Sequence, residues 1–188
     1  MKLTSLLLVA LIGISTTQLP AQESHEWIPQ GIVTLQQSAS SKTDFTFDHS
    51  MLVLASKLEP DNEDLRRVIA GVSGISVHRY RFTHQGVNAL GQYDEVLHSV
   101  SEEYRAAGWK QVMNNREKGE APSVSAIWVR LENNAISNVA LLFAKANEVD
   151  FVVVSGSISP MDLSHLGGHF GIPKIEGGVV VPNSERLP

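Results

Sequence analysis

The sequence contains no cysteine. This absence excludes disulfide bonds, thiolate metal ligands, cysteine nucleophiles and a lipid anchor attached through an N-terminal cysteine. The chain must therefore be stabilised by its apolar core alone. With 188 residues, of which 43% are hydrophobic, it is long enough to form one.

Long apolar runs are also absent, because the run near the N-terminus covers only residues 6–14. A membrane-spanning helix needs about 20 apolar residues. The run follows Lys2 and leads through polar residues to Ala21, which is the pattern of a secretory signal peptide. We therefore expect a signal peptide over residues 1–21 and an exported protein, periplasmic or secreted, that keeps no transmembrane anchor after signal removal.

Basic residues are too few to give the chain a positive surface. Lysine and arginine total 15 against 20 acidic residues, for a net charge of −5. An acidic chain with scattered bases is a poor candidate for binding nucleic acid. The same balance argues against an anionic lipid surface.

Catalytic motifs are missing as well. The sequence has no G-x-S-x-G, S-x-x-K, P-loop or H-E-x-x-H pattern. The glycines at Gly167, Gly168 and Gly171 have the wrong spacing for a dinucleotide fingerprint and follow a predicted helix rather than a strand. We predict no catalytic residue and no cofactor, and the sequence leans away from an enzyme.

The most informative segment present covers residues 124–158, where three apolar stretches are separated by two turn signals. The pair Asn133 and Asn134 tolerates positive φ at both positions, as a type I′ hairpin turn requires. A hairpin closed there places Trp128 opposite Val139 and Ala126 opposite Leu141. One face of the meander would then carry four large side chains: Trp128, Val139, Leu141 and Phe143.

Helical patterns surround this meander. A helix capped by Asp48 or Ser50 is predicted to run through Leu58, and a second to follow Pro60. A third covers residues 93–107, and a capping box predicts a short helix after Ser159. In the first helix one stripe is predicted to hold Met51, Leu54, Ala55 and Leu58.

These elements predict an α+β two-layer sandwich, with a four- to five-stranded, mainly antiparallel sheet and helices packed on one face. The predicted organisation is a flexible N-terminal arm over residues 22–42, a single domain over 43–175 and a loose tail over 176–188. Phe45 and Phe47 are expected to share one face of an extended segment.

Three polar residues near the end of the chain have spacing that a metal site could use. Asp162, His165 and His169 would converge on one unbroken helix. Gly167 and Gly168 interrupt that helix, so solvated histidines at a polar helix end are the simpler interpretation. No metal is predicted, and these three residues are the only candidates for one.

The apolar character of both meander faces leaves two interpretations open. Trp128, Val139, Leu141 and Phe143 are either covered by the N-terminal segment or the tail, or they form a partner-binding surface. A surface of this kind would bind a second copy of the chain or an envelope protein.

The order of elements resembles an exported bacterial family, domain of unknown function 4252. The resemblance covers about residues 44–173, and it is clearest in residues 71–82, Gly108 and Trp109, the strand ending at Gly156, and residues 166–173. The resemblance implies an envelope or secreted location and an α+β fold, and it implies no activity and no site residues. We therefore hypothesise an exported, non-enzymatic module that acts by protein–protein binding or self-association. The alternatives are a metal-dependent hydrolase and a small-ligand carrier.

Overall fold

A computed structural model describes residues 27–83, 89–117, 123–145, 147–170, 172, 174–176 and 179–181. The predicted signal peptide over residues 1–21 lies outside these described residues, and it stays a prediction.

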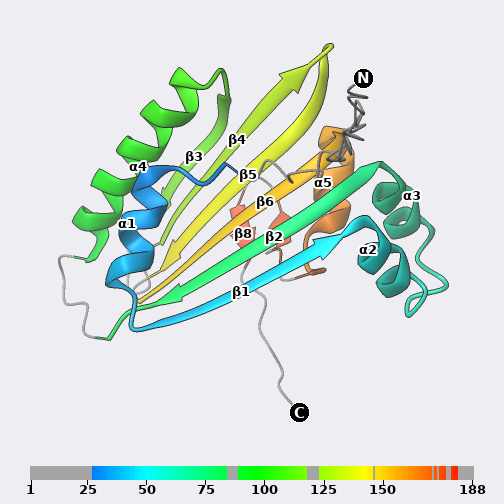
Figure 1. Cartoon of the computed structure of the whole chain (residues 1–188), viewed down its shortest axis with the longest axis horizontal. Helices are drawn as coiled ribbons and strands as arrows, with labels where there is room; N and C mark the ends of the chain where they lie inside the picture. Colours follow the sequence, from blue (N-terminus) through cyan, green and yellow to red (C-terminus); the bar gives the residue numbers. More distant parts are fainter. Residues whose placement is uncertain are drawn as a thin grey trace, which may run out of the picture.

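The centre of the fold is a six-stranded antiparallel sheet with the order β1-β2-β6-β5-β4-β3 (Figure 1). β6 is apolar on both sides and lies inside the sheet, where both of its faces are covered. A separate two-stranded sheet pairs β7 with β8. The strands are β1 Ser41–Asp48, β2 Val72–Arg81, β3 Lys110–Glu117, β4 Ser123–Glu132, β5 Ala135–Lys145, β6 Glu148–Ile158, β7 Lys174–Glu176 and β8 Val179–Val181.

Several helix starts follow directly from their capping residues. Asp48 accepts a hydrogen bond from the backbone N of Met51 at 2.8 Å, which starts α2. Ser159 and Asp162 form the predicted capping box of α5. The helices are α1 Gln30–Ser38, α2 His49–Ser56, α3 Glu63–Gly71, α4 Ala89–Ala106 and α5 Pro160–Leu166.

Two apolar cores lie on opposite faces of the sheet. The first core joins α1 and α4 to one face, and α1 and α4 also pack against each other (Figure 1). Its buried members are Ile32, Leu35, Tyr80, Phe82, Tyr93, Leu97, Val100, Tyr104, Trp109, Val124, Ala126, Trp128, Ala140, Leu142, Ala144, Val149, Phe151 and Val153.

The second core joins α2, α3 and α5 to the other face. These three helices gather at the opposite end of the sheet from α1 and α4 (Figure 1). Its buried members are Leu52, Leu65, Val68, Ile69, Val72, Ile75, Val77, Ile127, Val129, Val139, Leu141, Phe143, Val152, Val154, Ile158, Leu166 and Ile172.

The α+β class is therefore confirmed, while two details of the prediction are wrong. The sheet has six strands rather than four or five, and helices pack on both faces rather than on one. The cause is the apolar character of both sides of the central strands, because each side needs its own cover. The same two-sided cover explains why β2 and the residue after it carry apolar side chains on both faces. Ile75 and Val77 face the second core, while Tyr80 and Phe82 face the first.

The β4–β5 hairpin has the predicted turn but not the predicted register. Asn133 and Asn134 have φ of 52° and 64°, as a type I′ turn requires. Moving away from the turn, Leu131 pairs with Ile136, but the next pair joins Arg130 to Asn138. Ser137 is therefore an extra residue on β5, with no partner residue opposite it on β4. Trp128 consequently pairs with Ala140 rather than Val139. A one-residue shift moves every later side chain to the other face of the pair.

The N-terminal segment differs from the predicted arm over residues 22–42. Residues 30–38 form α1, whose Ile32 and Leu35 are buried in the first core, and residue 41 begins β1. β1 pairs with β2 over its whole length, with Phe45 opposite Val77 and Phe47 opposite Ile75. Both phenylalanines therefore lie on the face of the second core, which confirms that they share a face. In the predicted tail, β8 and the last residue of β7 are described.

Candidate functional site

The four residues predicted to form a partner-binding face do not share a face. Trp128 belongs to the first core, while Val139, Leu141 and Phe143 belong to the second. The bulge at Ser137 separates them. All four side chains are at most 6% exposed, so each is covered within the chain itself. The cover is helical: α1 and α4 lie over Trp128, and α2, α3 and α5 lie over the other three side chains, whereas the sequence offered an extended N-terminal segment or the tail as cover. Partner binding by these four residues stays a prediction.

Asp162 is engaged at the start of α5. Its Oδ2 accepts a hydrogen bond from the backbone N of Ser159 at 2.9 Å, and its own N donates to Ser159 Oγ at 3.1 Å. The hydrogen bond with Ser159 lowers the pKa of the Asp162 carboxyl, because it stabilises the ionised form. Asp162 therefore acts as a helix cap.

The two histidines meet different carboxylates. His165 Nδ1 lies 4.0 Å from Asp64 Oδ2, and His169 Nδ1 lies 3.4 Å from Glu59 Oε1. Among the residues that the structure describes, no group of three or more His, Cys, Asp or Glu side chains could hold a metal ion. The predicted trio is thus distributed over a helix cap and two separate histidine–carboxylate contacts.

A charged cluster lies at the end of the sheet formed by β2 and β6. Arg79 Nε donates to Asp150 Oδ1 at 2.7 Å and lies 3.4 Å from Glu148, which also accepts from Arg81 at 2.9 Å. Burial raises the pKa of the Asp150 carboxyl, and the Arg79 guanidinium opposes that rise. This cluster pairs its charges internally and holds the register of β2 against β6.

The most exposed apolar feature among the described residues is a stripe on α2. Met51, Leu54 and Leu58 are 49%, 65% and 83% exposed, and together we call them the apolar stripe. Their spacing of three and then four residues places them on one side of the helix and its C-terminal turn. Leu58 belongs to that turn because its N donates to the carbonyl of Ala55.

The opposite side of α2 is also apolar. Leu52 is completely buried in the second core, and Val53 packs against it. A helix with apolar residues on both sides normally has cover on both sides. α2 is covered only on the Leu52 side by the part of the chain that the structure describes, which leaves the apolar stripe open to solvent.

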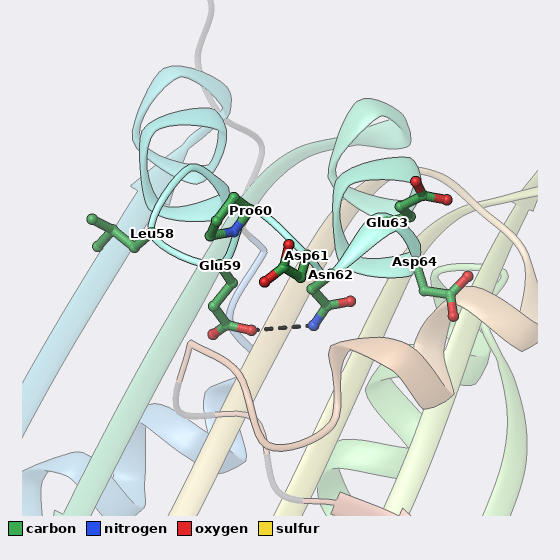
Figure 2. Close-up of a pocket in the computed structure, with 7 residues that line it drawn as sticks. All are labelled: Leu58, Glu59, Pro60, Asp61, Asn62, Glu63 and Asp64. Atoms are coloured by element: carbon green, nitrogen blue, oxygen red, sulfur yellow. Dashed lines mark hydrogen bonds between the residues drawn. The ribbon is translucent and has the colours of Figure 1, made fainter.

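An acidic loop follows the stripe immediately. Residues 58–64 line a depression of about 720 Å³ between α2 and α3, and its carboxylates are Glu59, Asp61, Glu63 and Asp64 (Figure 2). Glu59 accepts a hydrogen bond from Asn62 Nδ2 at 3.1 Å, which Figure 2 marks with a dashed line. Arg66 donates to the carbonyl of Pro60 at 2.6 Å and so fixes the backbone of the loop.

The segment after α5 supports the loop from the side of the second core. His169 contacts Glu59, and Phe170 packs against Phe47 with ring centroids 5.6 Å apart. The glycine-rich segment is therefore a structural brace between β1 and the acidic loop. Asp61 and Glu63 make no ion pair with the described residues, so the loop presents net negative charge beside the apolar stripe.

The sequence predicts the apolar stripe on α2, but it does not indicate whether the stripe faces the core or the solvent. The predicted stripe of Met51, Leu54, Ala55 and Leu58 lies along one side of α2 and the turn after it, although α2 ends at Ser56 rather than at Leu58. Its exposure could not be predicted, because Leu52 and Val53 offer an equally apolar alternative for the buried side. The sequence predicts a helix start after Pro60, whereas α3 begins only at Glu63, with Asn62 as its cap.

Comparisons with known proteins agree with the resemblance seen in the sequence. A family model described as "Domain of unknown function (DUF4252)" matches residues 38–166. No curated protein and no solved structure gives a significant match. Within the described part of the chain, no helix is long and apolar enough to cross a membrane.

Proposed function

The chain belongs to the DUF4252 family, and we propose that this member is an exported module that acts by binding a protein partner through the apolar stripe and the acidic loop. The family description assigns no activity, so the support comes from the surface of the chain itself.

One observation carries the proposal. Met51, Leu54 and Leu58 form an aligned and exposed apolar row on a helix whose other side is already buried. Leaving such side chains in water forgoes about 1.5–3 kcal/mol for each one that a partner could bury fully. Contiguous apolar patches rimmed by polar residues are typical of protein interaction sites.

The negative charge of the acidic loop indicates which side chains a partner would carry. Asp61 and Glu63 lie directly after Leu58 in a loop that is concave and acidic (Figure 2). A partner that offers apolar side chains followed by lysine or arginine matches both parts. The same carboxylates would repel an anionic membrane, which favours a protein partner over a lipid surface.

Site-specific photo-cross-linking tests the proposal in the cells that produce the protein. A photoreactive residue replaces Leu54 in one strain and Val112 in another. Val112 is 60% exposed and belongs to β3, a strand that lies at the opposite end of the fold from α2 (Figure 1). We expect a discrete protein adduct from position 54 and none from position 112. Adding Leu58→Glu to the first variant should reduce that adduct several-fold.

Export is tested with the same cells. The protein recovered from the periplasm or the medium should lack the first 21 or so residues by N-terminal mass spectrometry. Equal adducts from positions 54 and 112, or adducts with lipid alone, would contradict partner binding through the stripe. A full-length protein retained in the cytoplasm would contradict export.

A further inference from the structure

The outer edge of β1 is a second surface that meets no other strand within the described part of the chain. β1 is the first strand in the sheet order, and it pairs only with β2 among the described residues. Seven of its eight side chains are exposed, and Phe45 is 50% exposed. A strand edge of this kind presents unpaired N–H and C=O groups in a row that another extended chain can pair with.

The two edges of the sheet differ in how they are protected. β3, at the other edge, has a register shift between Gln111 and Met113, and such irregularities block pairing with further strands. β1 pairs with β2 through eight consecutive residues without a shift, and it contains no proline. β1 is therefore the regular edge, and regular edges accept an added strand.

The sequence of β1 is complementary to itself. When two copies of β1 run antiparallel with Phe45 facing its counterpart, Lys42 of each copy lies opposite Asp48 of the other. The same register places Thr43 opposite Phe47. Opposite charges and paired aromatic rings across strands both stabilise an antiparallel pair. Lys42 and Asp48 are both exposed and lie on the same side of β1, which these cross-strand contacts require.

We propose that the protein forms a homodimer in which the β1 strands of two copies pair antiparallel about Phe45, joining two six-stranded sheets into one. The partner is a second copy of this chain, because an unrelated strand would have no reason to match the order of Lys42, Phe45 and Asp48. The apolar stripe is separate from this edge and stays available for the protein partner.

Charge exchange between the two copies tests the register. In Lys42→Glu, an acidic residue faces Asp48. In Asp48→Lys, a basic residue faces Lys42, and the change also removes the cap of α2, so thermal unfolding of this variant is measured beside its dimerisation. Each variant alone should dimerise about tenfold more weakly in analytical ultracentrifugation of the mature protein, since each dimer changes two attractive pairs into repulsive ones. A mixture of the two variants restores both attractive pairs, so it should form heterodimers as strongly as the unchanged protein.

Phe45→Asp gives a stronger test, because it places two carboxylates opposite each other at the centre of the interface. We expect it to be monomeric over the concentration range in which the unchanged protein dimerises. Val112→Asp is the matched control, since Val112 is similarly exposed on the irregular edge, and this variant should dimerise normally. Circular dichroism and thermal unfolding of each variant verify that the monomer is folded.

The outcomes separate this proposal from the proposed function. An unchanged protein that is monomeric throughout the range overturns the dimer, while cross-linking from position 54 is unaffected. A dimer that survives Phe45→Asp but is lost in Leu54→Glu shows association through the apolar stripe, and it also overturns pairing at β1. A mixture of the charge variants that fails to associate overturns the register.

Discussion

Gly156 lies against Gly71 at the point where α3 ends and β2 begins, and neither position has room for a side chain. A Cβ at Gly156 would overlap the carbonyl oxygen of Gly71, and a Cβ at Gly71 would lie 2.5 Å from the carbonyl oxygen of Ser157. Gly156 also has a φ of 139°. Together the two glycines let α3 approach β6 and seat its apolar side on the second core.

Gly156→Ala is expected to lower the free energy of unfolding by about 2–4 kcal/mol, because it combines backbone strain with a steric overlap against main-chain atoms. Urea unfolding measures the change. Gly108→Ala is the control, since Gly108 has a φ of 83° but a Cβ there would meet no atom within 4 Å. That variant should lose only about 1–2 kcal/mol. Equal losses would contradict the importance of the close approach.

Arg79→Met is expected to destabilise the fold by about 2 kcal/mol at pH 7, because it leaves the largely buried Asp150 carboxylate without the arginine that pairs with it. Burial already raises the pKa of Asp150, and losing Arg79 raises it further. Protonation then relieves the penalty, so the loss should be smaller at pH 4.5 than at pH 7. Urea unfolding at the two pH values measures this difference.

Arg105→Met provides the comparison for that experiment. Arg105 pairs with Glu102 at 2.6 Å on the exposed side of α4. An exposed pair of this kind contributes about 0.3–0.5 kcal/mol, so the variant should lose little at either pH. A loss for Arg79→Met that does not change with pH would mean that the Asp150 charge is not its cause.

Tyr93→Phe is expected to make the protein less sensitive to alkaline pH. Burial raises the pKa of Tyr93 to about 12, from 10.0 for an accessible tyrosine. The neutral phenol is therefore favoured in the folded state, and its contribution is present below pH 10 and is lost as the pH rises toward 12. Unfolding free energies at pH 9 and pH 11 should differ less in the variant than in the unchanged protein. An identical difference would contradict this assignment.

Asp162→Asn is expected to cost about 0.5 kcal/mol at pH 7, because it removes a negative charge at the N-terminus of α5 while keeping a hydrogen-bond acceptor. The pKa of Asp162 is lowered by its hydrogen bond with Ser159, so the stabilisation is present above about pH 4 and is lost as the pH falls through the lowered pKa. Thermal unfolding of the two proteins should converge near pH 2. Binding of zinc by the unchanged protein, abolished in this variant, would instead revive the metal hypothesis.

The parts of the fold that follow from local rules were predictable from sequence. The Asn133–Asn134 turn, the cap at Asp48 and the capping box at Ser159 each depend on a few adjacent residues. The sequence does not predict α1, because its apolar residues are few and their burial depends on α4, which lies far away in the sequence. Long-range packing of this kind has no local signature.

The candidate site illustrates a different limit. One extra residue at Ser137 moved Val139, Leu141 and Phe143 to the face opposite Trp128, and periodicity alone does not show a bulge. In α2, which of Leu52 and Leu54 is buried depends on how the helix is oriented against the sheet, and β1, which leads directly into α2, sets that orientation. A local pattern that is apolar on both sides cannot make that choice.

The three tryptophans of the chain all surround one side chain. Measured between ring centroids, Tyr104 lies 5.1 Å from Trp27, 4.5 Å from Trp109 and 5.2 Å from Trp128. This aromatic group lies on the side of the sheet that α1 and α4 cover. Intrinsic fluorescence of this protein therefore reports on the first core alone. Detachment of α2, α3 or α5 from the other face would leave that signal nearly unchanged, so only agreement between fluorescence and circular dichroism can establish that both cores unfold together.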